Sequence, residues 1–365
     1  MNTAQLQFNI IFTPYTAEYL SPFISTLLEW TDCRYRIVAN ACNAADIDLL
    51  ETLCDGDARL EFLVAPGETM IDHGSMLNWL LERTDSPWFC FMDSDIMATG
   101  PYMERIAGHL EHHDVFSTGH PLWHSPDDIV IPPAFRRIHG IHFGTTDGKC
   151  LGGTYFAIYN SEKLRTEMQT TGVDFRIYRW ENVPDTHRET LRSAGLDKLE
   201  YDTGMLLMSL MHANGVRFSA EDLENVCHLG GFSSRAEDEP AYYFRGRPDR
   251  IAINLLGGVL AAPLFYLADS WYALRRPAFG VSPSESRCMP FSERRLLEGR
   301  IRKRRNTARY FKALMQSLLG GTPKPQVPKL GYAPAEQRIA VAGQQIERLY
   351  AQYFATHPER KLAGH

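Results

Sequence analysis

The run Trp88-Phe-Cys-Phe-Met92, followed by Asp93-Ser94-Asp95, constrains the fold more than any other part of the chain. Five apolar residues in a row, placed just after Ser86-Pro87, fit a short central strand that is covered on both faces of a sheet. Open α/β sheets bind their ligands outside the carboxyl ends of the strands. The sequence therefore predicts a ligand site at the end of this strand, with two carboxylates in it.

The segments around this strand follow an α/β pattern, in which β-like runs alternate with segments of helical spacing. Strands are predicted at 8–13, 35–39, 60–65, 88–92, 115–118 and 150–159, and helices at 21–30, 44–53, 74–83, 102–113 and 203–214. After about residue 235 the pattern changes to longer helices with Pro-containing connectors. We therefore expect an α/β domain over residues 1–235 and a helical carboxyl-terminal region over 236–365.

The overall charge bears on the class of partner. The formal net charge is -6 and the isoelectric point is near 6.1. General nucleic-acid binding normally needs a basic field that replaces counterions around phosphates. The composition therefore argues against a nucleic-acid partner.

Cysteine usage and the first residues favour a cytoplasmic protein. The seven cysteines include no Cys-x-x-Cys pair, and their odd number argues against a complete disulfide framework. The amino terminus shows neither a signal peptide nor an apolar anchor. The longest apolar run, 251–268, is interrupted by Asn254, Gly257-Gly258 and Pro263, so a buried or interfacial helix is the better interpretation than a membrane span.

The two carboxylates after the apolar strand are suited to a divalent metal. Asp93 and Asp95 offer hard oxygen ligands that Mg²⁺ or Mn²⁺ prefers, and such an ion can hold a diphosphate. The alternative interpretation is a pair of loop aspartates that cap the next turn.

Four segments together resemble glycosyltransferases of the GT-A fold, and specifically their large inverting, family-2-like group. They are Trp88–Ile96 around the paired aspartates, His73–Thr84 before them, Tyr201–Leu207, and Cys227–Ser233 with its histidine. Their order and spacing over roughly residues 6–235 carry the resemblance. It implies a GT-A-like, Rossmann-like mixed sheet flanked by helices, with a helical carboxyl-terminal extension.

The same resemblance implies roles for individual residues. Asp95 is expected to be the main metal ligand, Asp93 and Ser94 to meet the ribose or the metal's water shell, and His228 to complete the coordination. The segment Thr13-Pro14-Tyr15, with Asn40, is expected to hold the base and ribose. The ordinary alternatives are a packed tyrosine at Tyr15 and a structural histidine at 228.

Asp202 is the candidate general base, because a carboxylate can take the proton of an acceptor hydroxyl as it attacks the anomeric carbon. Its alternative role is the N-cap of the helix that follows. Tyr201 stands where an acidic residue is commoner in the family. Gly152, Gly153 and Thr154 are expected to line the donor-sugar or acceptor pocket, or else to form a bulged strand.

The segment 294–312 carries nine Lys and Arg residues. A solvated helix face is one interpretation, and contact with an anionic partner or with the surface of a membrane is the sharper one.

The sequence as a whole favours a metal-dependent glycosyltransferase. We expect it to move a sugar from a UDP- or GDP-type donor to a hydroxyl-bearing acceptor, with inversion, using Mn²⁺ or Mg²⁺. A nucleotidyltransferase of related fold is an alternative, although no Gly-rich, basic phosphate loop follows the first strand. A phosphatase with an Asp nucleophile and a non-catalytic nucleotide-sugar or glycan-binding protein are the other classes.

Overall fold

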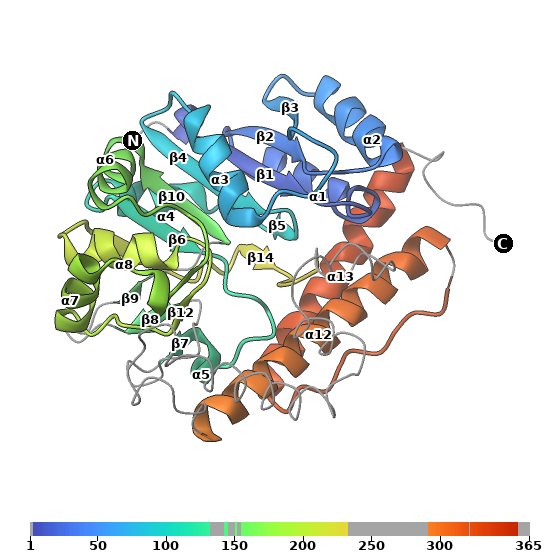
Figure 1. Ribbon diagram of the computed structural model, residues 1–365. Coiled ribbons are helices and arrows are strands. Elements are labelled where there is room, and N and C mark those ends of the chain that lie inside the picture. The colour runs from blue at the N-terminus through green and yellow to red at the C-terminus, as the bar shows by residue number, and fades with distance from the viewer. Residues whose placement is uncertain are drawn as a thin grey trace.

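The chain is built around a seven-stranded mixed sheet with helices on both faces and two long helices at its carboxyl-terminal end (Figure 1). The computed structural model describes residues 3–131, 142–144, 150–151, 155–232, 291–320 and 322–356. The strand order is β13-β6-β10-β4-β1-β2-β3. The predicted α/β class, with a mixed sheet flanked by helices and a helical extension, is confirmed.

The bounds of the elements are as follows. The main sheet contains β1 (Gln7–Phe12), β2 (Arg34–Ala39), β3 (Leu60–Val64), β4 (Trp88–Asp93), β6 (Val115–Thr118), β10 (Phe156–Asn160) and β13 (Phe218–Ala220). Smaller sheets join β5 (Ile96–Ala98) to β14 (Val226–His228), β11 (Tyr178–Arg179) to β12 (Glu200–Tyr201), and β7 (Val130–Ile131) to β8 (His142–Gly144) and β9 (Cys150–Leu151). The helices before residue 232 are α1 (Ala17–Trp30), α2 (Ala44–Asp55), α3 (His73–Glu82), α4 (Met103–Leu110), α5 (Pro126–Ile129), α6 (Ser161–Thr171), α7 (Asp185–Ser193) and α8 (Met205–Ala213), with short 3-10 turns η1 (Thr3–Gln5) and η2 (Trp180–Asn182).

The strand that ends in Asp93 lies in the middle of the sheet, as predicted. Strands β1 to β4 run parallel to one another, whereas β10 is antiparallel to both of its neighbours, β4 and β6. Parallel strands end at the same edge of a sheet. Asp93 therefore shares that edge with the residues that follow β1 and β2, among them Thr13 and Asn40.

The side chains of β4 alternate between two cores. Phe89 and Phe91 lie in the core formed with α3, α6 and α8, whereas Cys90 and Met92 lie in the core formed with α1 and α4. Both faces of the strand are thus covered. This explains why the strand reads as a continuous apolar run and not as an alternating one.

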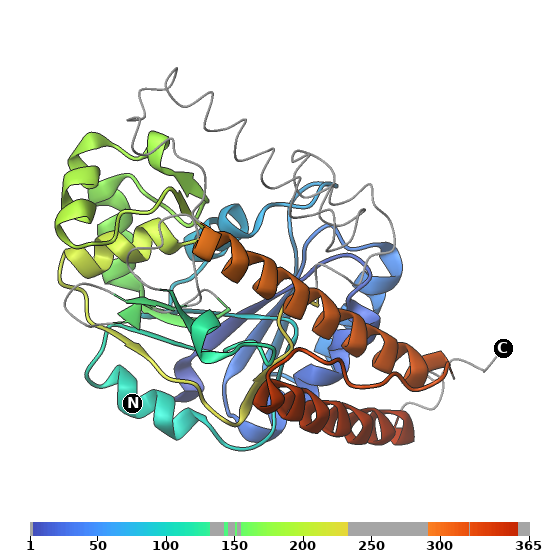
Figure 2. The ribbon, with the colours of Figure 1, turned by 90° about the horizontal axis from the view of Figure 1, so that it is seen from below.

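The carboxyl-terminal helices share a core with the sheet. Helix α12 (Phe291–Gly320) packs against α13 (Ala333–Thr356), which also contacts α1 (Figures 1 and 2). Phe311 and Ile339 belong to the same buried cluster as Phe8 of β1. The Tyr350 hydroxyl donates a hydrogen bond to the backbone oxygen of Tyr19 at 2.6 Å. The boundary that we propose near residue 235 lies outside the described residues.

One predicted element is wrong as a single strand. The segment 150–159 contains two strands of different sheets, because β9 pairs with β8, whereas β10 pairs with β4 from Phe156 onward. Strand pairing of this kind cannot be read from the pattern of one segment. Gly152, Gly153 and Thr154, which stand between the two strands, lie outside the described residues.

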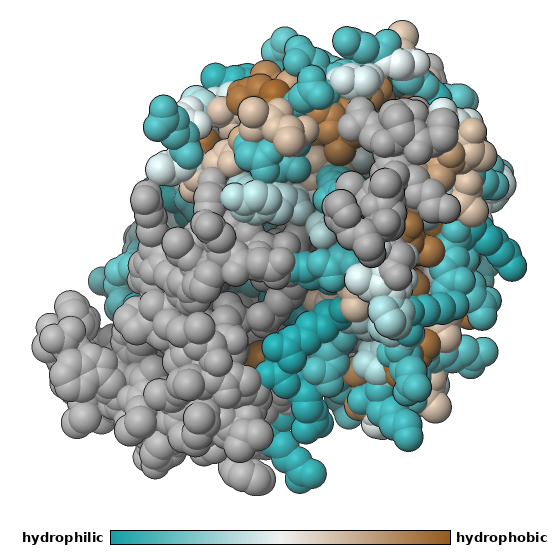
Figure 3. All heavy atoms as spheres, turned by 90° about the vertical axis from the view of Figure 1, so that its right-hand side faces the viewer, coloured by the Kyte–Doolittle hydropathy of each residue, from teal (hydrophilic) through white to brown (hydrophobic). Residues whose placement is uncertain are grey.

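The described helices and cysteines bear on membrane crossing and on disulfide formation. Among the helices that the structure describes, none combines the length and apolar character that a membrane crossing needs. The run 251–268 lies outside the described residues. In the coloured part of Figure 3, hydrophilic side chains lie beside smaller hydrophobic patches. Five cysteines are free thiols: Cys33, Cys42, Cys54, Cys90 and Cys227.

The outermost strand β13 is tied to the sheet through Asp114, and removing that carboxylate is expected to destabilise the fold. Asp114 is 5% exposed, and its carboxylate accepts hydrogen bonds from the backbone N–H and the guanidinium of Arg217 at 3.1 Å. It also forms an ion pair with Lys163 at 2.9 Å. We expect Asp114→Asn to lower the free energy of unfolding by about 1–3 kcal/mol, the range for hydrogen bonds to charged groups. Chemical denaturation measures the change.

The hydrogen bonds from Arg217 also hold the pKa of Asp114 well below its usual range. Because this pKa is lower in the folded state than in the unfolded state, the ionised carboxylate contributes its full stabilisation only above the unfolded pKa of about 4. This contribution to the free energy of unfolding is lost as the pH falls below that value. The difference between wild type and Asp114→Asn should therefore shrink in acid. Asp185→Asn is the control, because its side chain is 92% exposed and its pair with Arg188 should contribute less than about 1 kcal/mol.

Candidate metal centre

Asp93, Asp95 and His228 come together at the carboxyl end of β4. The chain turns after Asp93 and enters β5 at Ile96, and β5 pairs antiparallel with β14 so that His228 lies opposite Ile96. One ligand atom from each of the three side chains lies within 4.8 Å of the others. The pairing of two short strands thus joins residues that are far apart in the sequence.

The imidazole of His228 is oriented by the backbone. Its Nδ1 lies 2.7 Å from the carbonyl oxygen of Gly119, and a carbonyl oxygen can only accept, so Nδ1 carries the proton. The other nitrogen, Nε2, faces the carboxylates, at 3.2 Å from Oδ1 of Asp95 and 3.6 Å from Oδ2 of Asp93. Nε2 is buried and has no hydrogen-bond partner among the described residues. Metal-bound histidines are commonly held in this way, with the second ring nitrogen bonded to a carbonyl.

The two carboxylates differ in exposure and in support. Asp95 is 2% exposed, and its Oδ2 accepts a hydrogen bond from the backbone N–H of Phe232 at 3.0 Å. The side chain of Asp93 is 32% exposed. Asp95 and His228 therefore form the enclosed side of the cluster, and Asp93 forms the side that solvent or a ligand can reach.

The electrostatics of the cluster favour a cation between the three side chains. Burial on its own lowers the pKa of His228, but the carboxylates of Asp95 and Asp93 outweigh it and raise the pKa to about 10. Burial raises the pKa of Asp95, and the nearby imidazole more than offsets this, so the pKa is lowered overall. A proton or a divalent ion can supply the positive charge that the carboxylates stabilise at Nε2.

The donor set is chemically suited to a divalent metal. Carboxylate oxygens suit Mg²⁺ and Mn²⁺, and an imidazole nitrogen is a ligand of the transition metals. Nε2 of His228 is buried and faces both carboxylates, at 3.2 and 3.6 Å, so the three side chains can share either a proton or such an ion.

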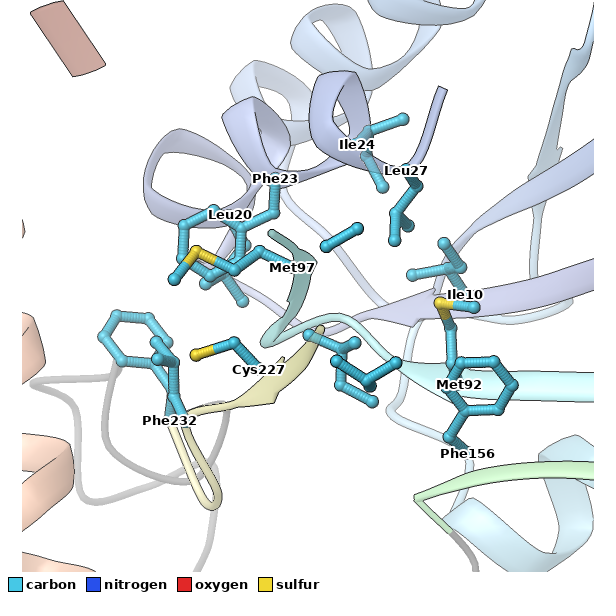
Figure 4. Packing of buried hydrophobic residues seen from close by; sticks show 14 of the residues in the cluster. Ile10, Leu20, Phe23, Ile24, Leu27, Met92, Met97, Phe156, Cys227 and Phe232 are labelled. Atoms are coloured by element: carbon cyan, nitrogen blue, oxygen red, sulfur yellow. The ribbon is translucent and has the colours of Figure 1, made fainter. Parts of the chain in front are cut away.

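The cluster rests on well-packed apolar residues. Met97 of β5, Cys227 of β14 and Phe232 after β14 point toward Leu20 and Phe23 of α1 (Figure 4). All five are buried in one core cluster. The strands that carry Asp95 and His228 are thus held by packing on one side, which fixes the positions of the ligand atoms.

The loop after His228 leaves no room for a side chain at Gly230. Its φ is +79°, and a Cβ there would lie 2.4 Å from Cβ of Pro121 and 2.7 Å from Nε1 of Trp123. We expect Gly230→Ala to lower the free energy of unfolding by more than the roughly 1–2 kcal/mol that the left-handed conformation alone costs, and to weaken Mn²⁺ binding. Thermal unfolding with and without Mn²⁺ measures both effects.

Gly215 is the matched control, because its φ is +87° but nothing lies within 4 Å of its Cβ position. Gly215→Ala should show the conformational cost alone. Equal losses in the two variants would contradict a steric role for Gly230.

Tyr155 lies against the metal cluster. Its backbone oxygen accepts a hydrogen bond from Asp93 N at 2.7 Å, and its ring centroid lies 5.0 Å from that of His228. Burial raises the pKa of Tyr155; the charge of Arg300 opposes this, and those of Asp202 and Asp93 add to it. Asp202 is exposed, and its Oδ1 accepts a hydrogen bond from Thr203 N at 2.9 Å. The N-cap of α8 is Gly204, with no side-chain cap.

The predicted donor-binding segment lies at the same edge of the sheet. Tyr15 is 43% exposed and has a left-handed φ of 62°, and its N–H bonds Oδ2 of Asp46 at 2.7 Å. Backbone strain of this kind is concentrated at functional sites. Thr13 Oγ1 is buried without a hydrogen-bond partner among the described residues, and Pro14 lies in the turn between them. Contacts of these residues with a nucleotide stay a prediction.

Asn40 and Ser94 are buried, and Asn40 has a visible structural task. The Asn40 amide donates to the backbone oxygen of Ile71 at 2.8 Å and accepts from Ile71 N at 3.0 Å, which holds the segment before α3. The next residue, Ala41, has a φ of 55°. A ligand contact by Asn40 stays a prediction, and strain at Ala41 is a feature that its residue type does not signal.

Three site residues were not singled out from the sequence: Tyr155, Arg300 and Arg304. Tyr155 directly follows the predicted Gly152-Gly153-Thr154 segment, and both arginines belong to the basic segment 294–312. Arg304 of α12 lies over Gly231, where a Cβ would meet its side chain. The contact of Arg304 with the Gly231 loop depends on how α12 packs in the fold, which the basic run in the sequence does not signal.

Known proteins were compared with the chain at the levels of sequence and structure. No protein-family model matches it, and no curated protein matches it. The structure is similar to S. aureus TarS 1–349 in complex with UDP-GlcNAc, at 13% identity and a TM-score of 0.38, over 95% of this chain and 92% of that one. It is also similar to the galactosyltransferase LgtC in complex with donor and acceptor sugar analogs, at 11% identity and a TM-score of 0.37, over 65% and 82% of the two chains. A third match is the glycosyltransferase GlyE of Streptococcus pneumoniae TIGR4, at 10% identity and a TM-score of 0.33, over 60% and 45%. The matches thus include glycosyltransferases, the class that the sequence resembles.

Proposed function

We propose that the protein is a metal-dependent glycosyltransferase that moves a sugar from a nucleotide-sugar donor of the UDP or GDP type to a hydroxyl-bearing acceptor. The observation that carries the proposal is the cluster of Asp93, Asp95 and His228 at the carboxyl end of the central strand, with Nε2 of His228 buried and facing both carboxylates. In open α/β sheets this edge is where ligands bind.

In this proposal Asp95 and His228 hold Mn²⁺ or Mg²⁺ from the enclosed side, and Asp93 holds it from the side that faces the donor. The imidazole in the donor set favours Mn²⁺ over Mg²⁺. The bound ion would stabilise the negative charge that develops on the departing nucleoside diphosphate. Thr13, Pro14 and Tyr15 are assigned to the base and ribose, since the carboxyl end of β1 lies beside that of β4.

Asp202 is proposed as the general base. Its carboxylate is exposed, does not cap α8 and lies in the group of charges around Tyr155. A carboxylate in this place can accept the proton of the acceptor hydroxyl while the hydroxyl oxygen attacks the anomeric carbon. Direct displacement of this kind inverts the configuration at that carbon.

A thermal-shift screen of UDP- and GDP-sugars, with and without Mn²⁺, tests the proposal. A ligand that binds the native state raises the free energy of unfolding and with it the unfolding temperature. At a free ligand concentration of a hundred times the dissociation constant, the gain in free energy is about 2.7 kcal/mol. We expect one nucleotide-sugar to stabilise the protein and to do so more strongly with Mn²⁺. Stabilisation by a nucleoside triphosphate with release of pyrophosphate would instead indicate a nucleotidyltransferase. Binding without turnover over a broad acceptor panel would indicate a binding protein.

A further inference from the structure

The inward face of α12 changes from apolar to cationic where the helix passes the metal centre. Residues 300, 304, 307, 311 and 314 follow the spacing of three and four that puts side chains on one face of a helix. Thr307, Phe311 and Leu314 are fully buried in the protein. One and two turns earlier, the same face carries Arg304 and Arg300. A face that packs as core thus turns cationic beside the proposed active site.

The inward cations of α12 differ in how they are satisfied. Lys303 forms an ion pair with Asp128 at 2.5 Å and donates a hydrogen bond to the hydroxyl of Ser125 at 2.9 Å. The Nη1 atom of Arg300 is buried and makes no hydrogen bond within the described residues. Lys303 is therefore explained by the fold, and Arg300 is not.

Other buried polar atoms near Arg300 are unpartnered as well. Both ring nitrogens of His124, which is 1% exposed, and Oδ1 of Asp128 lack a hydrogen-bond partner in the part of the chain that the structure describes. Burial, followed by the charge of Arg300, lowers the pKa of His124 well below its usual value, so that the ring is neutral. These groups offer hydrogen-bonding positions to a polar ligand next to a guanidinium.

The Nη1 atom of Arg300 is shielded from water without a hydrogen bond among the described residues, although the side chain as a whole keeps some exposure. Burial accordingly lowers the pKa of Arg300, against the opposing charges of Tyr155, Asp128 and Asp202. Asp128, the nearby buried carboxylate, already pairs with Lys303. The charge that would balance Arg300 is therefore expected to come from a ligand.

The position of Arg300 along the helix indicates which substrate brings that charge. Arg304 lies over Gly231, close to the metal centre. Leu296 lies two turns of the helix before Arg304 and packs against a second core cluster. That cluster contains Tyr201 and Met205, which stand on either side of Asp202 in the sequence. Arg300 lies between these two points, and Asp202 and Tyr155 are among the charges that act on it. Arg300 thus lies on the stretch of α12 that leads from the metal centre toward the proposed base, where an acceptor hydroxyl would stand.

We propose that Arg300 binds an anionic group of the acceptor, so that the hydroxyl-bearing acceptor also carries a phosphate or a carboxylate. This inference rests on the proposed function, because it uses Asp202 to define the acceptor side. A guanidinium recognises phosphate and carboxylate through paired, charge-assisted hydrogen bonds, which a neutral acceptor cannot supply. Arg300 acts as an acceptor-binding residue and takes no part in bond making.

Glycerol 1-phosphate and glycerol are the probes, because they differ in the anionic group. Binding is measured by calorimetric titration and by thermal shift, without any donor. We expect wild type to bind glycerol 1-phosphate and not glycerol, and Arg300→Gln to bind it about tenfold more weakly or worse, as for loss of charge-assisted hydrogen bonds. Arg302→Gln is the matched control, since Arg302 is exposed on the same helix, and it should bind like wild type.

Two further measurements separate this role from others. Arg300→Met should unfold at the same or a higher temperature than wild type, because it replaces a guanidinium with a buried, unbonded nitrogen by an apolar side chain. A clearly lower temperature would indicate a structural role and overturn the proposal. UDP and GDP binding with Mn²⁺ should be unchanged in Arg300→Gln. If that variant loses nucleotide binding and keeps glycerol 1-phosphate binding, Arg300 serves the donor and the inference is wrong. Equal binding of glycerol and glycerol 1-phosphate by wild type would also overturn the inference. Failure of the proposed function would show in a different way, as the absence of Mn²⁺-dependent binding of nucleotide-sugars.

Discussion

Asp95→Asn is expected to reduce sugar transfer by roughly 10³-fold while the protein remains folded. The substitution keeps an oxygen that can accept the hydrogen bond from Phe232 N, and it removes the charge that faces Nε2 of His228. Lewis-acid stabilisation is worth several kcal/mol in the transition state, and about 1.4 kcal/mol corresponds to a factor of ten in rate. Steady-state transfer assays at saturating donor measure the loss.

Removal of the metal from wild type should reproduce that loss. EDTA is expected to lower wild-type activity to the level of Asp95→Asn and to leave the residual activity of the variant unchanged. Addition of Mn²⁺ should restore the activity of wild type. Asp222→Asn is the matched control, because Asp222 also faces a histidine, His120 at 3.4 Å, but lies outside the metal cluster. Its activity should stay within about twofold of wild type, since surface pairs contribute little. Full EDTA sensitivity in Asp95→Asn would show that the ion binds elsewhere.

The sequence predicts the central part of the fold well because local pattern and packing agree there. The strand over 88–92 is uniformly apolar because Phe89 and Phe91 enter one core while Cys90 and Met92 enter the other. The strand 115–118 has the predicted bounds. Strands and helices whose apolar period is imposed by a nearby core can be recognised without knowledge of their partners.

The elements that the sequence does not predict depend on pairing between distant segments. Strand β5 has three residues and exists because β14 pairs with it, 130 residues later in the chain. The same pairing places His228 against Asp95, which the family resemblance suggested but periodicity alone could not. Arg300 is a further case, since its position in a basic run is typical of a solvated helix face. Its Nη1 atom is buried because α12 packs against α5 and the residue before it, where Lys303 contacts Asp128 and Ser125.

Asp202→Asn should lower kcat for transfer by about 10²- to 10⁴-fold, the usual contribution of a positioned general base. An amide cannot accept the proton of the acceptor hydroxyl, whereas it occupies the same volume. Since Asp202 is not a member of the Asp93, Asp95 and His228 cluster, the KM for the donor and the affinity for Mn²⁺ should stay within about twofold. Steady-state assays with varied donor and acceptor separate these constants.

The helix-cap alternative for Asp202 makes the opposite prediction. Loss of an N-cap costs about 1 kcal/mol of stability and changes kcat little. Because Gly204 occupies the cap of α8 without a side-chain bond, and an amide oxygen can still accept the hydrogen bond from Thr203 N, Asp202→Asn should cost less stability than the roughly 1 kcal/mol of a lost N-cap. Asp185→Asn, a highly exposed aspartate at the start of α7, controls for the general effect of removing a carboxylate. A variant with normal kcat and a lower unfolding temperature would assign Asp202 to the helix, and the proton of the acceptor would then need another base near Tyr155.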